Sequence, residues 1–319
     1  MASLDCVLVA DVGGTTSRFG IVTRGSLEPR DIHELKGDDF ANLQEAIPHY
    51  LTLTKSRPAR AVIAMAGPVK GGTVHLTNRR GWSFVPEELA QQLGLARVDV
   101  MNDFAALAWA LPYLPPDELR SIGGVPLDGA ATKLVLGPGT GLGVAALARH
   151  NGRWTPVPSE GGHIELAAIT PREQAVFDRV RSQYGRVSAE AIACGSGIAR
   201  IDAAIAWIDS GEITEREGKD ISDAARAGEA RGREVMDIFF DALARFSGDM
   251  ALAFLAQGGV YIGGGVAVKT IDLMDEARFR ANFVAKAPHE KLVAAIGTSL
   301  ITARYPALTG CAAYAIYES

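Results

Sequence analysis

Short apolar runs alternate with stretches of helical periodicity over the first hundred residues, which is the pattern of an α/β fold. The apolar runs predict strands, at residues 6–10, 19–22, 61–66, 73–76 and 98–101. The periodic stretches predict helices, at residues 40–53 and 86–93 and in an alanine-rich run that ends at Leu111. We therefore expect an α/β domain in the N-terminal third of the chain.

The pattern becomes more helical beyond a segment with two prolines, residues 113–117, which predicts a boundary or hinge. Strands are predicted here at residues 133–136, 144–148 and 260–263. Helices are predicted at residues 173–184, 188–192, 198–208, 223–246 and 306–314. The later part of the chain thus combines fewer strands with more helices.

The first apolar run leads into Asp-Val-Gly-Gly-Thr-Thr, residues 11–16, and a second apolar strand follows. Paired glycines let the backbone turn tightly and approach a ligand, and exposed N–H groups beside hydroxyls suit a phosphate. A carboxylate next to a bound phosphate, here Asp11, is the usual kind of Mg²⁺ ligand. A hairpin whose turn is merely glycine-rich would have the same sequence, since short glycine motifs are common.

A second loop of the same kind, Gly-Pro-Gly-Thr-Gly-Leu-Gly at residues 137–143, also lies between two apolar strands. The repetition predicts an internal duplication with two hairpins that face phosphate. Residues 141–146 match the G-x-G-x-x-A of dinucleotide folds, but that motif requires a helix directly after it. Here Asn151-Gly152 predicts a hairpin turn instead. The sequence contains no G-x-x-x-x-G-K-[ST], which excludes a P-loop.

Composition and charge exclude several other classes of protein. With 319 residues, 48% of them hydrophobic and 22% charged, the chain is an ordinary globular protein long enough for two domains. A net charge of −5 without a basic stripe argues against nucleic acid as a partner. The scattered Cys6, Cys194 and Cys311 predict buried thiols in a reducing compartment and lack the spacing of a zinc site.

One uncharged segment, residues 251–268, has to be weighed as a membrane span. Gln257 and five glycines interrupt it, so it is better divided into a helix, a turn and a strand. The N-terminus lacks the basic region and long apolar core of a signal peptide. We expect a cytoplasmic protein that does not bind membranes.

Three groups of polar residues could carry chemistry. Asn102 and Asp103 end a buried strand, where sites in α/β sheets form, although both are also good helix N-caps. Two glycines between Glu160 and His163 let both side chains turn toward one ligand, whereas a single histidine is more often structural. Glu190 lies in a first helical turn, where it can favour the helix dipole. It is one position too early for a capping box with Ser188.

Together these motifs resemble the bacterial glucokinase family, within the hexokinase–actin–Hsp70 ATPase superfamily. They occur in the family's order: L-V-A-D-V-G-G-T-T, T-N-x-x-x-W (residues 77–82), N-D-F-x-A (102–106), G-x-G-T-G-L-G, E-G-G-H, V-S-A-E (187–190), G-G-V-Y-I-G-G-G (258–265) and P-A-L-x-G-x-A-A-Y (306–314). Ser159 stands where a glycine often precedes E-G-G-H. The cysteine-rich zinc motif of related ROK sugar kinases is absent from the sequence, which favours the glucokinase branch.

The resemblance implies a kinase that transfers the γ-phosphoryl group of ATP to the 6-hydroxyl of glucose. It makes Asp103 the general base and Asp11 the ligand of Mg²⁺, through water. The residues that it assigns to the sugar are Asn78, Asn102, Asp103, Glu160, His163 and Glu190. Those that it assigns to the nucleotide are Ala10, Asp11, Val12, Gly13, Gly14, Thr15, Thr16, Gly139, Thr140, Gly141, Gly263, Gly264 and Gly265.

The same resemblance implies an α/β protein with the two-domain actin-like ATPase (ribonuclease H-like) fold. A small α/β domain would comprise residues 1–110 and 300–319, and a larger α+β domain residues 111–299. The substrates would bind between the domains, and glucose would close them about the segments near Tyr113 and the start of the C-terminal helix. The family also implies a homodimer.

Other functions share some of these features. A kinase for another hexose would carry the same motifs, and polyphosphate or ADP could replace ATP as the donor. A non-catalytic sugar-sensing regulator usually has an N-terminal helix-turn-helix, and seven residues precede the first motif here. An actin-like or Hsp70-like ATPase that acts on proteins would lack N-D-F and E-G-G-H, which are both present.

Overall fold

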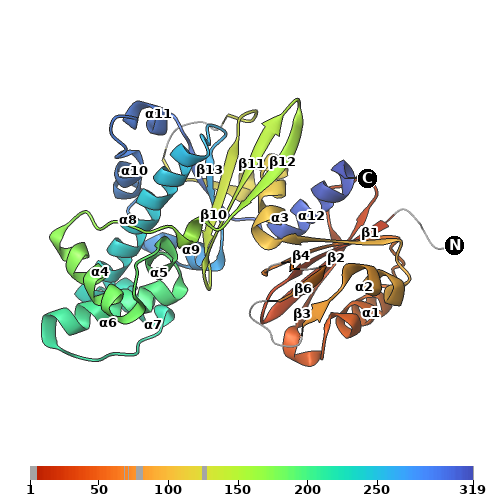
Figure 1. Cartoon of the computed structure of the whole chain (residues 1–319), viewed down its shortest axis with the longest axis horizontal. Coiled ribbons are helices and arrows are strands. Elements are labelled where there is room, and N and C mark those ends of the chain that lie inside the picture. The colour runs from red at the N-terminus through yellow and green to blue at the C-terminus, as the bar shows by residue number, and fades with distance from the viewer. Residues whose placement is uncertain (1–5, 68, 71, 77–81, 124–127, 319) are drawn as a thin grey trace. The chain divides into compact units, whose positions relative to one another are not determined.

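The computed structural model describes residues 6–67, 69–70, 72–76, 82–123 and 128–318. The chain divides into two compact units, which we call unit 1 (residues 1–115 and 303–319) and unit 2 (residues 116–302). Each unit is built around its own sheet, which Figure 1 shows with the helices that cover it.

The sheet of unit 1 has the strand order β3-β2-β1-β4-β8. The first three strands form an antiparallel meander: β1 (Cys6–Val12), β2 (Thr16–Thr23) and β3 (Arg30–Lys36). The other two run parallel to β1: β4 (Arg60–Met65) and β8 (Arg97–Asn102). Because strands β1, β4 and β8 run the same way, their carboxyl ends meet at one edge of the sheet.

Helices cover both faces of this sheet, which is why its central strands are mostly apolar. Leu8 belongs to a core with helices α1 (Leu43–Thr54) and α2 (Pro86–Leu93). Val9, which points to the opposite face, belongs to a core with α3 (Asp103–Ala110) and α12 (Pro306–Tyr317). A small sheet and two short 3-10 helices complete the unit: β5 (Val69–Lys70), β6 (Thr73–His75), β7 (Ser83–Phe84), η1 (Gly37–Asp39) and η2 (Leu111–Tyr113).

The sheet of unit 2 repeats the arrangement of unit 1, with the order β12-β11-β10-β13-β14-β9. An antiparallel meander comprises β10 (Lys133–Pro138), β11 (Leu142–His150) and β12 (Arg153–Ser159). Two strands run parallel to β10, namely β13 (Val260–Ile262) and β14 (Thr298–Ile301), and β9 (Leu119–Ser121) adds an antiparallel edge. The predicted duplication of a strand, a glycine loop and a strand is therefore confirmed.

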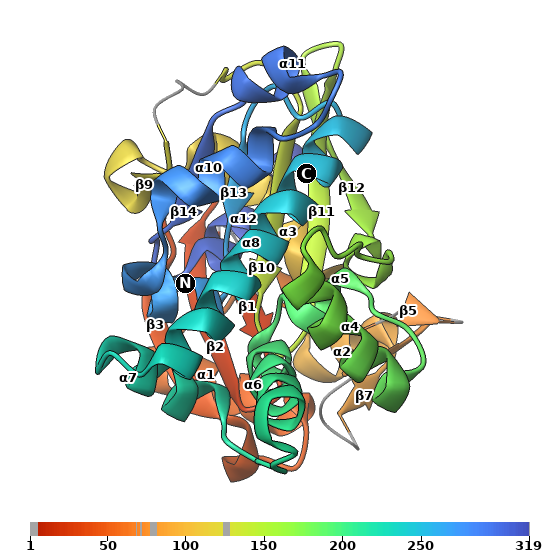
Figure 2. The same cartoon turned by 90° about the vertical axis from the view of Figure 1, so that its left-hand side faces the viewer.

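The helices of unit 2 gather around α8 (Ala230–Ala253), the longest helix described, whose side chains are mostly buried (Figure 2). It packs against α6 (Gly195–Ser210), α7 (Gly218–Arg226) and α10 (Glu276–Val284). The remaining elements are η3 (Pro116–Glu118), η4 (Gly161–His163), α4 (Pro171–Tyr184), α5 (Ala189–Ile192), α9 (Gly265–Thr270), η5 (Ile271–Leu273) and α11 (Glu290–Ala294).

Several expectations from the sequence need correction. The helix predicted at residues 223–246 is two helices, α7 and α8, because Gly228 takes a φ of +92° that ends the first. The N-terminal helix begins at Leu43, after an Asn42 cap, not at residue 40. Cys6 is partly exposed, whereas Cys194 and Cys311 are buried as expected, and none of the three is in a disulfide bond. Among the described residues, no helix is long and apolar enough to cross a membrane.

Candidate active site

In unit 1, the predicted site residues collect at the carboxyl edge of the sheet. Val12 at the end of β1 pairs with Met65 of β4, which pairs with Asn102 at the end of β8. Asp11 and Asp103 therefore lie within two strands of each other, although 92 positions separate them in the sequence. The predicted Asn78 lies outside the described residues.

Asp11 is bound by a cation from its own hairpin. A guanidinium nitrogen (Nη1) of Arg18, on β2, donates to Oδ2 of Asp11 at 3.1 Å. Burial raises the pKa of Asp11, and the charge and hydrogen bond of Arg18 oppose that rise. Arg18 also lies 3.9 Å from Glu34, so the hairpin carries a chain of alternating charges. Arg18 was not predicted as a site residue; its signal in the sequence is a basic residue two positions beyond residues 11–16.

The turn after Asp11, which we call the first glycine loop (residues 11–16), is closed by its own backbone. The N–H of Gly13 donates to the carbonyl of Thr16 at 3.2 Å, and a Cβ on Gly13 would lie 3.0 Å from the same oxygen. A side chain at this position would therefore open the turn. The loop keeps the compact form that brings backbone N–H groups close to a phosphate.

Asn102 and Asp103 divide two tasks at the start of α3. Oδ1 of Asn102 accepts from the N–H groups of Phe104 at 2.9 Å and Ala105 at 3.3 Å, so Asn102 is the N-cap. Oδ1 of Asp103 also accepts from Phe104, at 3.0 Å. Burial raises the pKa of Asp103, and the negative charge of Asp11 raises it further.

In unit 2, residues 137–143, which we call the second glycine loop, lie against two other glycine-rich segments. The N–H of Gly139 donates to Gly141 O at 2.8 Å, and the N–H of Gly195, at the start of α6, donates to Gly139 O at 2.9 Å. Gly264 has a φ of +85°, and a Cβ there would collide with Pro138 of the loop. Two segments far apart in the sequence therefore converge on one loop. Of these, the start of α6 was not expected from the sequence.

The structure also brings together the three acidic and imidazole side chains of unit 2. Nε2 of His163 lies 3.9 Å from Oε2 of Glu160, and its Nδ1 lies 3.8 Å from Oε1 of Glu190. The side chains of Glu160, His163 and Glu190 are 92%, 59% and 31% exposed, so the first two present open polar atoms to solvent. Such a group of carboxylates with an imidazole can bind several hydroxyls of one polyol.

Glu190 does not cap its own helix. Ser188 caps this helix, because its hydroxyl accepts from the N–H of Ala191 at 3.2 Å. The Glu190 carboxylate is therefore available for another partner. Its Oε2 instead accepts from the N–H of Leu142, in the second glycine loop, at 2.8 Å. The sequence around Glu190 excludes a capping box but does not indicate Leu142 as a partner, because Leu142 lies 48 residues earlier.

The chemistry at Asp11 fits a hydrated Mg²⁺. Oδ2 is bound to Arg18, whereas Oδ1 accepts no hydrogen bond from any other residue that the structure describes. A magnesium ion is usually held by one or two carboxylates together with substrate phosphates and water, which is what this edge offers. No cluster of three or more His, Cys, Asp or Glu side chains with metal-binding geometry occurs in the described part of the chain.

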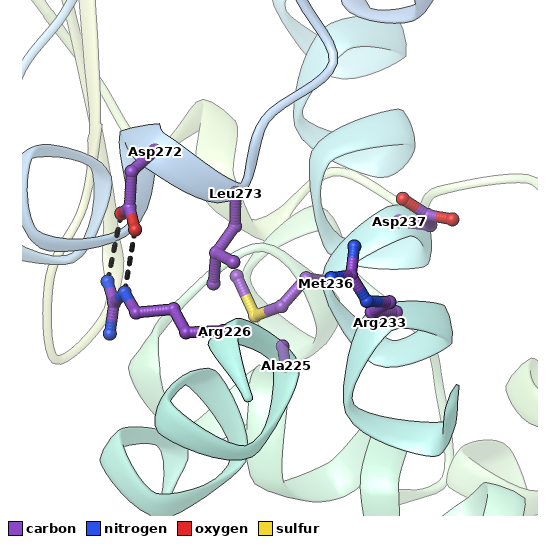
Figure 3. Close-up of a pocket in the computed structure, with 7 residues that line it drawn as sticks. All are labelled: Ala225, Arg226, Arg233, Met236, Asp237, Asp272 and Leu273. Atoms are coloured by element: carbon purple, nitrogen blue, oxygen red, sulfur yellow. Dashed lines mark hydrogen bonds and ion pairs between the residues drawn. The ribbon is translucent and has the colours of Figure 1, made fainter. Parts of the chain in front are cut away.

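A separate cavity of about 360 Å³ lies in unit 2 between α7, α8 and η5 (Figure 3). Arg226 is fixed at its wall by Asp272, with nitrogen–oxygen distances of 2.6 and 2.9 Å. The two arginines and two aspartates that line the cavity balance in charge. None of the site residues predicted from the sequence lines it, so the cavity is distinct from the predicted site.

Comparisons with known proteins agree over nearly the whole chain. The family model described as Glucokinase matches residues 8–317. A glucokinase of Brucella abortus is 40% identical over 311 residues, which cover 97% of this chain and 90% of that protein. The crystal structure of a glucokinase from an Antarctic psychrotroph has a TM-score of 0.90 at 36% identity and covers 99% of both chains.

A more distant structure shares the fold. A ROK family glucokinase from Streptomyces griseus, solved with glucose and AMPPNP, has a TM-score of 0.63 at 21% identity, over 96% of this chain and 98% of that one. The two-unit architecture is thus that of the actin-like ATPase fold, as expected from the sequence motifs.

Proposed function

Because this chain belongs to the glucokinase family, we propose which of its residues perform each part of the phosphorylation of glucose. The protein is a hexose kinase of that family and forms glucose 6-phosphate. In the proposed reaction, Asp103 accepts the proton of the 6-hydroxyl as O6 attacks the γ-phosphorus of ATP. The bond from the γ-phosphorus to the bridging oxygen breaks, and ADP leaves.

The observation that carries this proposal is the arrangement around Asp103. Asn102 supplies the N-cap of α3, so Asp103, the first residue of the helix, is not needed for that purpose. Its raised pKa makes it a stronger base than an ordinary aspartate. The position and the raised basicity of Asp103 therefore suit proton acceptance.

The phosphates are assigned to the two glycine loops. Phosphoryl transfer requires mainly positioning and charge stabilisation, which backbone N–H groups and a metal ion supply. Mg²⁺, bound through water to Asp11, would neutralise charge on the transferring phosphate. Arg18 holds the Asp11 carboxylate in place. The use of ATP is supported by the AMPPNP in the Streptomyces griseus structure, and Gly263, Gly264 and Gly265 are assigned to the adenosine side.

The sugar is assigned to Asn78, Asn102, Glu160, His163 and Glu190. A site built from such hydrogen-bonding groups rejects analogues that lack a hydroxyl, because the unpaired groups would remain desolvated. The glucose that is present in the Streptomyces griseus structure supports glucose as the sugar. Family membership supports a role in glycolysis, a homodimer and a cytoplasmic location for this chain.

A coupled assay over hexoses and donors tests the proposal. The purified protein with Mg²⁺ should phosphorylate glucose faster than mannose, fructose or galactose, and ATP should surpass ADP and polyphosphate. Replacement of Asp103 by Asn should remove most of the rate. Equal rates for another hexose would overturn the assignment of the sugar, and an active Asp103→Asn variant would overturn that of the base.

A further inference from the structure

We propose that Glu190 is a positioning residue that couples the sugar site to the second glycine loop. The proposal rests on the proposed function, because that function assigns His163 to the sugar and the loop to phosphate. The two carboxylate oxygens of Glu190 face different neighbours. Oε2 accepts from the backbone N–H of Leu142 at 2.8 Å, whereas Oε1 faces Nδ1 of His163 at 3.8 Å.

The fit between this carboxylate and the loop is tight. A Cβ on Gly141 would overlap Oε2 of Glu190, so the absence of a side chain at position 141 makes room for the carboxylate. By contrast, a Cβ on Gly139, two residues earlier in the same loop, would meet no atom within 4 Å. The requirement for glycine at position 141 therefore comes from Glu190.

Leu142 is held from a second side by the other sugar motif. A Cβ on Gly162, between Glu160 and His163, would overlap the carbonyl oxygen of Leu142. The N–H of Leu142 thus contacts one sugar motif and its carbonyl contacts the other. The backbone of the loop at this residue cannot shift without disturbing both motifs.

The two sugar motifs also form one rigid frame. The N–H of Leu166 donates to Val187 O at 2.9 Å, and the N–H of Ala189 donates to Ile164 O at 2.8 Å. Backbone bonds of this kind join the segment after His163 to the segment before Glu190. A sugar that immobilises Glu190 and His163 therefore also fixes the loop to which Oε2 is bound.

Binding at one site must then strengthen binding at the other. A sugar hydroxyl on Oε1 restricts the carboxylate to the rotamer that holds Leu142, which preorganises the loop for phosphate. Coupling between two ligands is reciprocal, so nucleotide on the loop raises the affinity for glucose equally. Because the link is one hydrogen bond to a charged group, its loss should change the affinity for nucleotide by roughly tenfold.

The first test measures binding of AMPPNP with Mg²⁺ by calorimetry, with and without saturating glucose. Glu190→Ala should weaken sugar-free nucleotide binding by roughly tenfold and abolish the effect of glucose. Glu190→Gln, which keeps an acceptor oxygen for Leu142, should restore most of the sugar-free affinity. Glu160→Gln, which alters the sugar site without touching the loop, should leave sugar-free affinity unchanged. Equal sugar-free affinities in wild type and Glu190→Ala would overturn the proposal.

The second test leaves Glu190 in place, so it does not depend on whether the variants of Glu190 fold. Gly141→Ala should displace the carboxylate and weaken glucose binding, measured without nucleotide, by several-fold or more, on the order of one lost hydrogen bond. Gly139→Ala, in the same loop, should not change glucose affinity. Identical glucose affinities for these two variants would contradict the coupling. The wild type serves as the control. If the wild type phosphorylates glucose, identical affinities of the two variants contradict only the coupling; if the wild type neither binds nor phosphorylates glucose, the proposed function itself has failed.

Discussion

Replacement of Asp103 by Asn separates catalysis from folding at this position. The variant keeps the shape of the side chain and an oxygen that can accept from the N–H of Phe104, but it cannot take a proton from the sugar. Loss of a general base lowers rates by about 10²- to 10⁴-fold. We expect kcat for glucose phosphorylation to fall within that range while the KM for ATP changes little.

The same substitution should not reduce stability at neutral pH. The pKa of Asp103 is raised in the folded protein by burial and by Asp11, so folding favours the protonated carboxyl. Ionisation of Asp103 therefore costs stability at pH 7, and this cost is absent in the neutral Asn variant. The variant should be at least as stable as wild type at pH 7. Any advantage should shrink as the pH falls through the folded-state pKa, where wild type gains its proton.

The matched control is Asn102→Ala. Its side chain caps α3, and loss of an N-cap costs about 0.5–2 kcal/mol, so urea unfolding should occur at lower denaturant concentration. A stopped-flow or coupled assay gives kcat, and urea titrations at pH 7 and pH 5 give the free energies of unfolding. Retention of more than about a tenth of wild-type kcat by Asp103→Asn, against the loss expected for a general base, would refute the assignment. A marked loss of stability at pH 7 would instead show that Asp103 is structural.

Three further predictions concern other parts of the site and core. Glu160→Gln should raise the KM for glucose far more than the KM for ATP, because the exposed carboxylate of Glu160 lies 3.9 Å from His163 and outside both glycine loops. The opposite pattern in steady-state kinetics would overturn the assignment of Glu160 to the sugar. Removal of divalent cations with EDTA should abolish phosphorylation but leave glucose binding, followed by calorimetry, and Mg²⁺ should restore the rate; undiminished activity would exclude the role of Asp11 at a metal. Gly310→Ala should destabilise unit 1 by about 1–3 kcal/mol in urea titrations, because its Cβ would overlap the backbone of Ala106 in α3, whereas Gly129→Ala, with open space around it, should have no effect.

The sequence was most informative where the signal is local. Apolar runs on both sides of a glycine turn identified the hairpins at residues 11–16 and 137–143, since a strand pair with a tight turn depends on neighbouring residues. The prediction of one long helix at residues 223–246 was wrong because the helical periodicity of the sequence continues through Gly228, where the helix is broken. Strands β3 and β14 and helix α10 lacked a clear local pattern and were not predicted. The motifs gave the family, which the comparisons confirm.

The partners of the polar side chains depend on the tertiary fold and could not be read from the sequence. The residue type and position of Glu190 allow a helix-dipole contact or a ligand. Its partner, Leu142, becomes its neighbour because η4 packs against β11 and α5 packs against η4. In the same way Arg18 meets Asp11, and the start of α6 meets Gly139, through hairpin register and chain crossings. The reason is physical: hydrophobic period and turn chemistry depend on near neighbours in the chain, whereas the partner of a buried carboxylate depends on which distant segments the core brings within 3 Å of it.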